Sequence, residues 1–432
     1  MDHAAAPLDP VSAAALEARG LRLGLVDTAD RNAFATWLRA DHRGFHMGEP
    51  SDEVMSASLD GLAYRRTTGV WDATAHDPES PVATVNSWES SMTLPGARQV
   101  PAWAISSVTV APTHRRKGIA RALLEAELRT AAGMGIPLAT LTVSESTIYG
   151  RFGFAPAAFA SELTIDKRRV SWTGPSAPGR VQFISIPEFR AGIAGLHDRI
   201  RSTGVGQLDA WDLRWDHTAG IVTEDKERSR SVRAVRYDDG DGVLRGLALY
   251  RVTGGDADYA AHTLIVEHLA TETDDAYAAL WRYLLEIDLV STITARDRRV
   301  DEPLMWQVSD MRGIREVLVD HLWTRILDVP AALEARGYGA QLSTVIDITD
   351  DLGFASGRFS LTIDSGTAVV TRTDAPAALA LSVNELSAIY LGGVSASALA
   401  GAGRIEEREP GSAAALDAAF HSPVAPWLSI WF

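Results

Sequence analysis

The sequence predicts an α/β protein of two or more domains whose last section changes to an α+β pattern. A strand, a basic loop, a helix and a second strand follow one another between Val108 and Phe154. A second alternation of strand and helix patterns runs from residue 181 to residue 290. The chain has 432 residues, and domains of roughly 100–200 residues suggest two to four of them. A hydrophobic content of 46% is enough for ordinary packed cores.

Several elements precede the basic loop. In chain order the patterns predict an alanine-rich start that is either disordered or an added helix (1–20), a strand (21–26), a helix with an apolar stripe (33–38), and two antiparallel strands (69–71 and 82–88). Asp27 to Asp30 supply N-cap candidates for the helix. Pro78 and Pro95-Gly96 are expected in the turns.

The loop itself has the character of an anion site. The alternation of Val108, Thr109 and Val110 predicts a strand before it. The loop consists of Arg115, Arg116, Lys117, Gly118, Ile119 and Ala120. Backbone N–H groups at a helix start are unpaired and carry the positive end of the helix dipole, and a glycine lets a phosphate approach closely. An ordinary connection between strand and helix is the alternative, because a basic glycine loop alone is a weak signal.

The segment after the loop is predicted to be a helix. Apolar residues recur at i,i+4, as in Leu124 and Leu128, and Arg121, Glu125 and Arg129 alternate in sign on the polar face. Two glycines and a proline are expected to end the helix and to separate it from a strand at residues 138–143.

These residues carry a family resemblance. Arg115-x-x-Gly118-x-Ala120 after a valine-rich strand is similar to the acetyl-CoA loop of GNAT (GCN5-related) N-acetyltransferases. Tyr149, Gly153 and Phe154 match a Y-x-x-x-G-F pattern of that family. The closer resemblance is to the Eis family of multi-acetylating GNAT enzymes. It rests on three further segments: Leu280–Leu284, Val329–Tyr338 and a chain that ends in Phe432.

The resemblance implies the domain layout. It predicts two GNAT-like domains in tandem and a sterol-carrier-protein-like C-terminal domain, at residues 1–166, 167–307 and 308–432. The second domain departs from the first where a cofactor loop is needed, because Ala270-Thr271-Glu272-Thr273 stands between strand and helix and an acid there would repel pyrophosphate. We therefore expect this domain to have lost cofactor binding. The acidic turn at residues 238–242 is predicted to be a hairpin turn and not a calcium loop.

The third section is predicted to be α+β. Short helices are expected at residues 322–327 and 331–336, strands at 343–348, 359–363 and 368–372, and further helices at 386–391, 396–399 and 413–420. A lipid or sterol cavity in this section rests on analogy of fold alone.

The resemblance also implies the chemistry. Acetyl-CoA is the expected cofactor, with its pantetheine arm beside Val108–Val110 and its pyrophosphate on the loop amides, and Ser144 matches a family cofactor contact. Tyr149 matches the general acid: a tyrosine of pKa about 10 is protonated at neutral pH and can donate to a thiolate of pKa about 8.5. In the family the C-terminal carboxylate reaches the active site, and here it belongs to Phe432. The apolar tail of residues 426–432 is consistent with docking, although a plain hydrophobic anchor explains it equally well.

The substrate side differs from the better-known members of the family. By resemblance the substrate-binding candidates are Trp37, Phe45, His46, Trp88 and Trp431. The segment Arg43-Gly44-Phe45-His46 and the penultimate Trp431 lack the acids that would hold a polycationic aminoglycoside. A packing role explains Trp37 and His46 as well. The expected partner is therefore a small amine or a lysine side chain, and the aminoglycoside is in doubt.

Composition excludes several functions. A formal net charge of −15 argues against broad nucleic-acid binding and is compatible with cationic substrates, or reflects solubility alone. The absence of cysteine removes a cysteine acyl-enzyme and thiolate metal sites, and we expect no metal. No signal peptide or membrane span is apparent, which predicts a cytoplasmic protein.

A homo-oligomer, namely a hexamer, is implied by the family alone. The competing hypotheses are a non-enzymatic lipid or sterol binder and an acyl-CoA sensor.

Overall fold

The computed structural model describes residues 3–255 and 258–432. The chain divides into two compact units, which we describe separately. Unit 1 contains residues 1–158, 320–426 and 431–432, and unit 2 contains residues 159–319 and 427–430. Two strands carry the chain from one unit to the other: β6 (Ala155–Asp166) and β12 (Ile314–Ile326).

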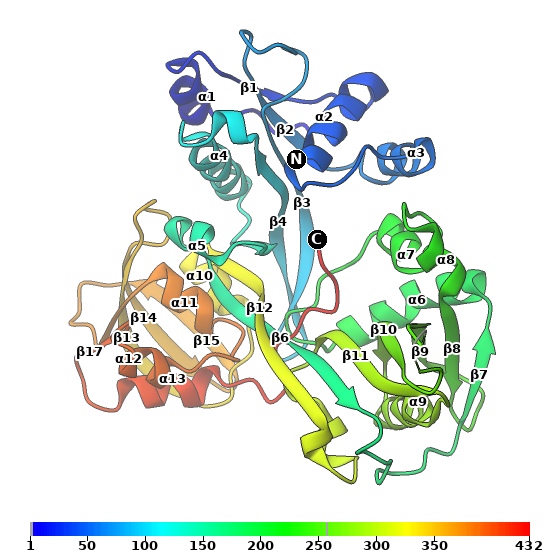
Figure 1. Cartoon of the computed structure of the whole chain (residues 1–432). Coiled ribbons are helices and arrows are strands. Elements are labelled where there is room, and N and C mark those ends of the chain that lie inside the picture. The colour runs from blue at the N-terminus through cyan, green and yellow to red at the C-terminus, as the bar shows by residue number, and fades with distance from the viewer. Residues whose placement is uncertain (1–2, 256–257) are drawn as a thin grey trace. The chain divides into compact units, whose positions relative to one another are not determined.

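The N-terminal part of unit 1 is a twisted sheet with helices on both faces (Figure 1). The strands lie in the order β1-β2-β3-β4-β5-β12. They comprise β1 (Arg22–Leu25), β2 (Arg66–Trp71), β3 (Ala83–Leu94), β4 (Arg98–Val110), β5 (Leu138–Thr142) and the end of β12. The helices are α1 (Pro10–Glu17), α2 (Arg31–Gly44), α3 (Asp52–Gly61), α4 (Ile119–Gly133) and α5 (Ser146–Tyr149).

Apolar residues on the two faces of the sheet form two separate cores. Leu16 of α1 and Leu123 and Leu128 of α4 pack over β3 and β4 on one face. Phe34, Trp37 and Leu38 of α2 form a smaller cluster with α3 on the other. The predicted stripe of α2 therefore faces the interior. The alanine-rich start is a helix, and Ser12 Oγ ties it to α4 by donating to the carbonyl of Ala122 at 2.7 Å.

Helix α4 is anchored to the sheet through a buried carboxylate. Glu127 is 1% exposed and accepts hydrogen bonds from Trp103 Nε1 at 3.0 Å and from Ser87 Oγ at 2.5 Å. Arg66 lies 3.7 Å away as its ionic partner. On the outer face the predicted pairs form, because Glu125 lies 3.7 Å from Arg121 and 3.4 Å from Arg129. The middle of α4 is thus anchored to β3 and β4 through Ser87 and Trp103.

The C-terminal part of unit 1 is a second sheet covered by helices, in the strand order β15-β14-β13-β16-β17. Its elements are α10 (Val329–Ala335), β13 (Leu342–Thr349), β14 (Gly357–Asp364), β15 (Thr367–Arg372), β16 (Leu379–Ser382), α11 (Val383–Ile389), α12 (Ala396–Gly401), β17 (Glu406–Glu407) and α13 (Ser412–Phe420). A buried ion pair joins this part to β12, where Arg325 Nη2 lies 2.7 Å from Asp350 Oδ1.

The helix predicted at residues 322–327 is wrong. This segment is the end of β12 and pairs antiparallel with β5, from Leu322 opposite Thr142 to Ile326 opposite Leu138. Aromatic and β-branched residues such as Trp323 and Thr324 favour a strand when a neighbouring strand is present. The short apolar run alone does not distinguish the two states.

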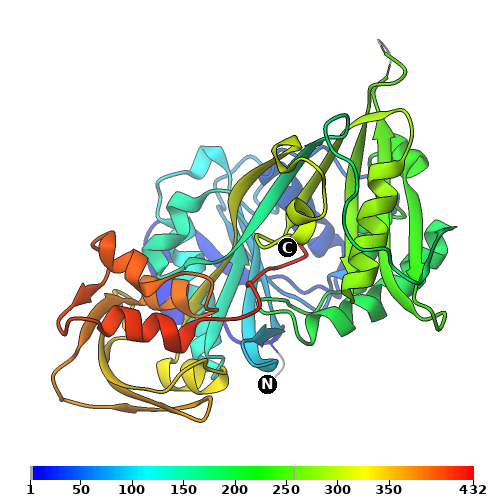
Figure 2. The same ribbon diagram turned by 90° about the horizontal axis from the view of Figure 1, so that it is seen from below.

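Unit 2 repeats the plan of a sheet covered by helices. Its strands lie in the order β6-β11-β10-β9-β8-β7. Besides β6 they are β7 (Arg180–Ile184), β8 (Arg233–Asp238), β9 (Leu244–Thr253), β10 (His262–Thr271) and β11 (Val290–Arg298), and the helices are α6 (Ile186–Arg201), α7 (Asp212–Thr218), α8 (Lys226–Ser231) and α9 (Asp274–Glu286). Figure 2 shows α9 lying along one face of this sheet, where Leu280 and Trp281 join the core. The hairpin predicted at residues 238–242 connects β8 to β9.

Candidate active site

The central feature of unit 1 is a fork between two parallel strands. Strand β4 pairs with β5 over only three residues, and the last pair is Ala104 with Thr140. Beyond this pair β4 continues to Val110 and pairs only with β3, whereas β5 continues to Thr142 and pairs with β12. The strands therefore diverge, and in the part of the chain that the structure describes no strand neighbours the backbone of β4 on the β5 side from residue 105 onward.

A bulge in β4 lies at the fork. The register against β3 shifts between Thr84 and Asn86, so β4 carries one extra residue there. Ser107 in the bulge adopts a left-handed conformation with φ 57°. Thr84 Oγ1 donates to the carbonyl of Ser107 at 2.8 Å, and Asn86 Nδ2 donates to Ser107 Oγ at 3.1 Å. Polar side chains of β3 thus hold the bulge in place.

Two of the three predicted strand residues, Val108 and Val110, present their backbone N–H groups to the fork. The N–H of Ala111 donates to the carbonyl of Val82 on the β3 side at 2.8 Å. Since successive N–H groups along a strand point to opposite sides, those of Val110 and Val108 point away from β3. Thr109 faces β3, where its hydroxyl lies 2.6 Å from that of Thr84.

The basic loop is built as a nest of backbone N–H groups. Arg116 and Gly118 both have a left-handed backbone, with φ 62° and 74°, and α4 begins directly after them at Ile119. Alternation of right- and left-handed residues turns consecutive N–H groups towards one point and favours anion binding. No acceptor in the described part of the chain bonds the N–H groups of residues 116–120. Arg19, which follows α1, donates to the carbonyl of Lys117 and so ties the loop to the end of α1.

Tyr149 lies in the turn that follows β5. Its side chain is 7% exposed and packs edge-on against Phe154, with ring centroids 6.3 Å apart. Asn384 of α11 fixes the turn by donating to the carbonyls of Gly150 and Phe154, each at 2.8 Å. Burial, together with the charge of Glu145, raises the pKa of Tyr149 above its usual value. The phenol is therefore protonated at neutral pH, as a proton donor must be.

The C-terminal residue lies at the end of β5. The N–H of Phe432 donates to Thr142 Oγ1 at 3.3 Å, and the same hydroxyl donates to a terminal oxygen of Phe432. The Phe432 ring packs edge-on against Trp88, with centroids 5.4 Å apart. The chain terminus and the tyrosine turn thus both lie at the C-terminal end of β5, which forms one side of the fork.

The remaining sequence candidates separate into three groups. Trp88 is buried beside Phe432. Trp37 is 1% exposed and donates to the carbonyl of Thr68 at 2.8 Å, so it belongs to the core and not to an open cleft, which corrects that prediction. Trp431 is 43% exposed and lies 5.2 Å from the ring of His321. Ser144 is exposed in the loop after β5.

An open cavity of about 620 Å³ lies at the C-terminal end of α2. His46, with a left-handed backbone at φ 58°, lines it, whereas Phe45 is exposed nearby at 43%. The cavity is polar and carries more basic than acidic groups: Arg39, His42, Arg43, His46, Glu49 and Asp77. Glu49 is already engaged by Arg39 at 2.6 Å.

Asp41 is a buried acid that the sequence reasoning missed. It lies in α2, one turn after the buried Trp37, and is 8% exposed. Burial raises the pKa of Asp41 to about 7, although the hydroxyls of Ser107 and Thr84 and the charge of Arg65 favour the ionised carboxylate. Its Oδ1 atom has no hydrogen-bond partner among the described residues. The sequence did offer one signal of this burial, because Asp41 stands four residues after Trp37 and therefore on the same, apolar face of the helix.

Replacing Asp41 by asparagine is expected to change how stability depends on pH. The carboxyl has an unperturbed pKa of 3.8, so between about pH 4 and pH 7 the folded state keeps a proton that the unfolded state loses. Stability of the wild type therefore falls as the pH rises through this window, by up to about 4 kcal/mol at 1.36 kcal/mol per unit. The amide of the replacing asparagine does not titrate. The free energy of unfolding is measured in urea at pH 5 and pH 8. Relative to the wild type, that of Asp41→Asn should be higher at pH 8 than at pH 5.

An exposed aspartate serves as the control. Asp60 on α3, with a side chain 67% exposed, pairs with Arg31 at the surface. Asp60→Asn should shift stability equally at both pH values. If Asp41→Asn behaved in the same way, Asp41 would not be the titrating group.

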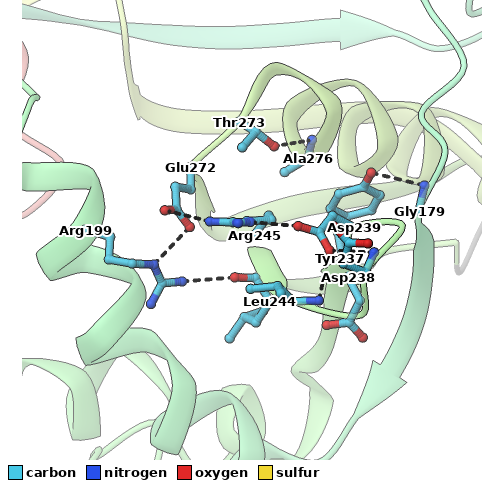
Figure 3. A network of polar contacts seen from close by, with 12 residues as sticks. Gly179, Arg199, Tyr237, Asp238, Asp239, Leu244, Arg245, Glu272, Thr273 and Ala276 are labelled. Atoms are coloured by element: carbon cyan, nitrogen blue, oxygen red, sulfur yellow. Dashed lines mark hydrogen bonds and ion pairs between the residues drawn. The ribbon is translucent and has the colours of Figure 1, made fainter.

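The corresponding place in unit 2 is built differently. Strands β10 and β11 also run parallel and separate after Val266 and Ala295. The helix that follows, α9, is capped by its own chain, because the N–H of Ala276 donates to Thr273 Oγ1 at 3.2 Å. Glu272 precedes the cap and bonds Arg199 at 2.9 Å and Arg245 at 3.1 Å (Figure 3). Here a protein carboxylate occupies the region that the basic loop provides in unit 1.

Within residues 3–255 and 258–432 no group of three or more His, Asp or Glu side chains is arranged to hold a metal ion. In the same ranges, no helix has the length and apolar character needed to cross a bilayer.

Family models cover most of the chain. The Acetyltransferase (GNAT) domain matches residues 26–157, and a second Acetyltransferase (GNAT) domain model matches residues 206–326. The Sterol carrier protein domain matches residues 329–429. The predicted fold class, two GNAT-like domains followed by a sterol-carrier-like domain, is confirmed.

Whole-chain relatives point the same way. An N-acetyltransferase of Streptomyces avermitilis is 36% identical over 401 residues, 91% of this chain and 95% of the relative. N-acetyltransferase Eis of Mycobacterium tuberculosis is 37% identical over 343 residues, 77% of this chain and 81% of the relative. The crystal structure of Eis1 from Mycobacterium abscessus superposes with a TM-score of 0.80 at 28% identity and covers 95% of this chain and all of that one.

GNAT enzymes transfer acetyl groups from acetyl-CoA to amines, and the fork, the nest at the start of α4 and the tyrosine turn lie within the first GNAT match. The non-enzymatic hypothesis is set aside by relatives named as N-acetyltransferases over nearly their whole length. The chain is a member of the Eis family of GNAT N-acetyltransferases.

Proposed function

We propose that this protein transfers an acetyl group from acetyl-CoA to a primary amine by direct attack in a ternary complex formed in unit 1. The observation that carries the proposal is the fork. One strand turns the N–H groups of Val108 and Val110 to an edge that no described strand covers, and the other holds the carboxyl group of Phe432 on Thr142. A thioester placed between them would meet donors on one side and an acceptor on the other.

The loop before α4 is proposed as the pyrophosphate site. Its N–H groups lack protein acceptors in the described part of the chain, and the helix dipole together with Arg115, Arg116 and Lys117 adds positive charge. Ile119 and Ala120 contribute the last two N–H groups. The pantetheine arm would then run along the unpaired edge of Val108–Val110, and exposed Ser144 lies at the end of β5 within the proposed cofactor site.

Gly118→Ala is expected to weaken acetyl-CoA binding about tenfold, which corresponds to about 1.4 kcal/mol. A methyl group at φ 74° strains the backbone and would clash with Nη1 of Arg19, so the side chain that bonds the loop would have to move. Gly135→Ala is the matched control, because Gly135 has φ 75° and open space around it at the other end of α4. Calorimetric titration with acetyl-CoA measures both. Equal losses in the two variants would mean that the loop does not hold the cofactor.

The proposed reaction needs one acid and one base. The amine nitrogen attacks the thioester carbon while the N–H groups of Val108 and Val110 stabilise the oxyanion. The C–S bond then breaks, and the thiolate takes the proton of the Tyr149 phenol. The carboxylate of Phe432 accepts the proton of the amine, directly or through a water, and solvent restores the proton of Tyr149. No covalent enzyme intermediate forms.

The acceptor is proposed to be a mono- or diamine, or a lysine side chain, in preference to a polycationic aminoglycoside. The cavity at the end of α2 presents two arginines and two histidines, and one of its two acids is already paired with Arg39. A polycation gains little in such surroundings. Phe45 and His46 at the mouth, with Trp88 and Trp431 near the chain terminus, are the proposed contacts.

We further propose that unit 2 binds no acetyl-CoA. The start of α9 is capped by Thr273, and Glu272 and Asp274 place negative charge where a pyrophosphate would lie. The unit is proposed to serve as scaffold, and the boundaries 1–166, 167–307 and 308–432 remain our division of the chain into functional domains.

The experiment that tests the function is release of free thiol from acetyl-CoA, followed against a panel of amines with the native C-terminus intact. Turnover with small amines or lysine peptides exceeding that with aminoglycosides is expected, and no turnover with any amine would contradict the proposal. The hexamer suggested by the family is checked by light scattering on the same preparation.

A further inference from the structure

Part of the C-terminal tail is hydrogen-bonded within unit 2, and the last two residues of the chain belong to unit 1. Residues Trp427–Ile430 make up the part in unit 2. Trp427 donates through its backbone N–H to the carbonyl of Val205 at 2.9 Å and through Nε1 to the carbonyl of Asp297 at 2.8 Å. Asp297 lies in β11, past the point where β11 leaves β10. The tail therefore enters the fork of unit 2.

Little space is left in that fork. The cavity remaining between the two strands measures about 40 Å³, and Trp427 and Ser429 form part of its wall. Leu428 and Ile430 are 0% and 1% exposed, whereas Ser429 between them donates through its hydroxyl to Gln207 Oε1. Such alternation is typical of an extended segment with one apolar face. In unit 2 the tail thus fills the place where diverging strands would otherwise admit a ligand.

Gln207 holds this segment with both ends of its amide. It is 1% exposed. Its Nε2 donates to the carbonyl of Trp427 at 2.9 Å, and its Oε1 accepts from Ser429 Oγ at 2.7 Å and from the Ser429 N–H at 3.3 Å. These bonds use the donor and the acceptor of a primary amide together, so neither a carboxylate nor an apolar side chain can replace it.

We propose that Gln207 is a positioning residue for the terminal carboxylate, and that the fork of unit 2 is the anchor of the catalytic tail. The inference rests on the proposed function, in which Phe432 acts as base. Only Trp431 separates Ile430 from Phe432, so fixing Trp427 to Ile430 restricts the range of the carboxyl group.

The test combines tail release with turnover. Gln207→Met keeps the length of the side chain and removes its hydrogen bonds. Gln182→Met is the matched control, because Gln182 bonds Asp238 at 2.8 Å in the same unit. Digestion of the native protein with a broad-specificity carboxypeptidase, followed by intact mass, reports how firmly the tail is held. We expect the carboxypeptidase to trim the tail of Gln207→Met at least tenfold faster than that of the wild type. The tail of Gln182→Met should be trimmed at the wild-type rate.

The activity arm separates positioning from general damage. In Gln207→Met kcat should fall at least tenfold, with KM for acetyl-CoA unchanged. In a chain that lacks Phe432, the same substitution should cause no further fall in kcat. Ser429→Ala, which removes one of the three bonds, should show a smaller change in the same direction. Wild-type trimming in Gln207→Met would overturn the anchor. Faster trimming with unchanged kcat, in a protein that needs Phe432, would overturn the positioning role. Full activity without Phe432 would overturn the proposed base, whereas the trimming result stands apart from it.

Discussion

Deletion of Phe432 is expected to lower kcat by about 100-fold or more, while acetyl-CoA still binds. The deletion moves the terminal carboxylate away from Thr142, whose hydroxyl in the wild type accepts from the N–H of Phe432 and donates to a terminal oxygen of that residue. Loss of a positioned general base typically costs 10²–10⁴ in rate. The nest before α4 lies in the loop that follows β4 and keeps its N–H groups. Thiol release under saturating acetyl-CoA, with calorimetry for binding, measures both effects.

Two further variants separate the carboxylate from the aromatic ring. Phe432→Ala keeps the terminal carboxylate and loses the packing against Trp88, so it should retain more activity than the deletion. A tag added after Phe432 replaces the carboxylate by an amide and should be as harmful as the deletion, whereas the same tag at the N-terminus should not. Full activity of the C-terminally tagged protein would rule out the carboxylate as base.

Tyr149→Phe is expected to lower kcat by about 10²–10⁴-fold and to leave the affinity for acetyl-CoA nearly unchanged. The substitution removes one oxygen from a side chain that is already packed against Phe154, so the turn should keep its shape. Because burial and Glu145 raise the pKa of Tyr149, activity should show no loss from phenol ionisation at neutral pH and should fall only in strongly alkaline solution. A pH series of kcat in the wild type checks this sign.

Tyr237→Phe provides the matched control for that experiment. Tyr237 is buried in unit 2, and its hydroxyl accepts from the N–H of Gly179 at 3.2 Å (Figure 3). This variant loses the same oxygen without touching the fork of unit 1, and its kcat should match the wild type. If Tyr149→Phe lost acetyl-CoA binding together with turnover, Tyr149 would be a structural residue and not the acid.

Local patterns were enough for the elements that depend on neighbours in the chain. The helix after Gly118 could be predicted because its apolar spacing and its Arg121–Glu125–Arg129 pairs are properties of one helix. The hairpin between β8 and β9 followed from its turn residues in the same way. The segment at residues 322–327 could not be assigned, because its state depends on pairing with β5, which is nearly two hundred residues away in the sequence.

The candidate site shows the same division. The loop, Tyr149 and Phe432 could be named as candidates because motifs and the chain end are visible in the sequence, and of these predictions only membership in the family is confirmed by the comparisons. Trp37 was assigned to a cleft although its helix turns it into the core. Asp41 was missed because its burial depends on Arg65, Thr84 and Ser107, which come from other elements.

The sequence by itself determined where this chain carries a basic glycine loop, a tyrosine ahead of a glycine turn and an apolar tail, since these are short-range arrangements of charge, glycine and hydrophobic residues. Only the tertiary structure decided that β4 stops pairing with β5 after Ala104, that Thr142 is hydrogen-bonded to Phe432, and that Gln207 is hydrogen-bonded to the tail. These features join segments up to 290 positions apart. Such contacts form because packing and backbone pairing bring distant segments together, and no local spacing encodes them.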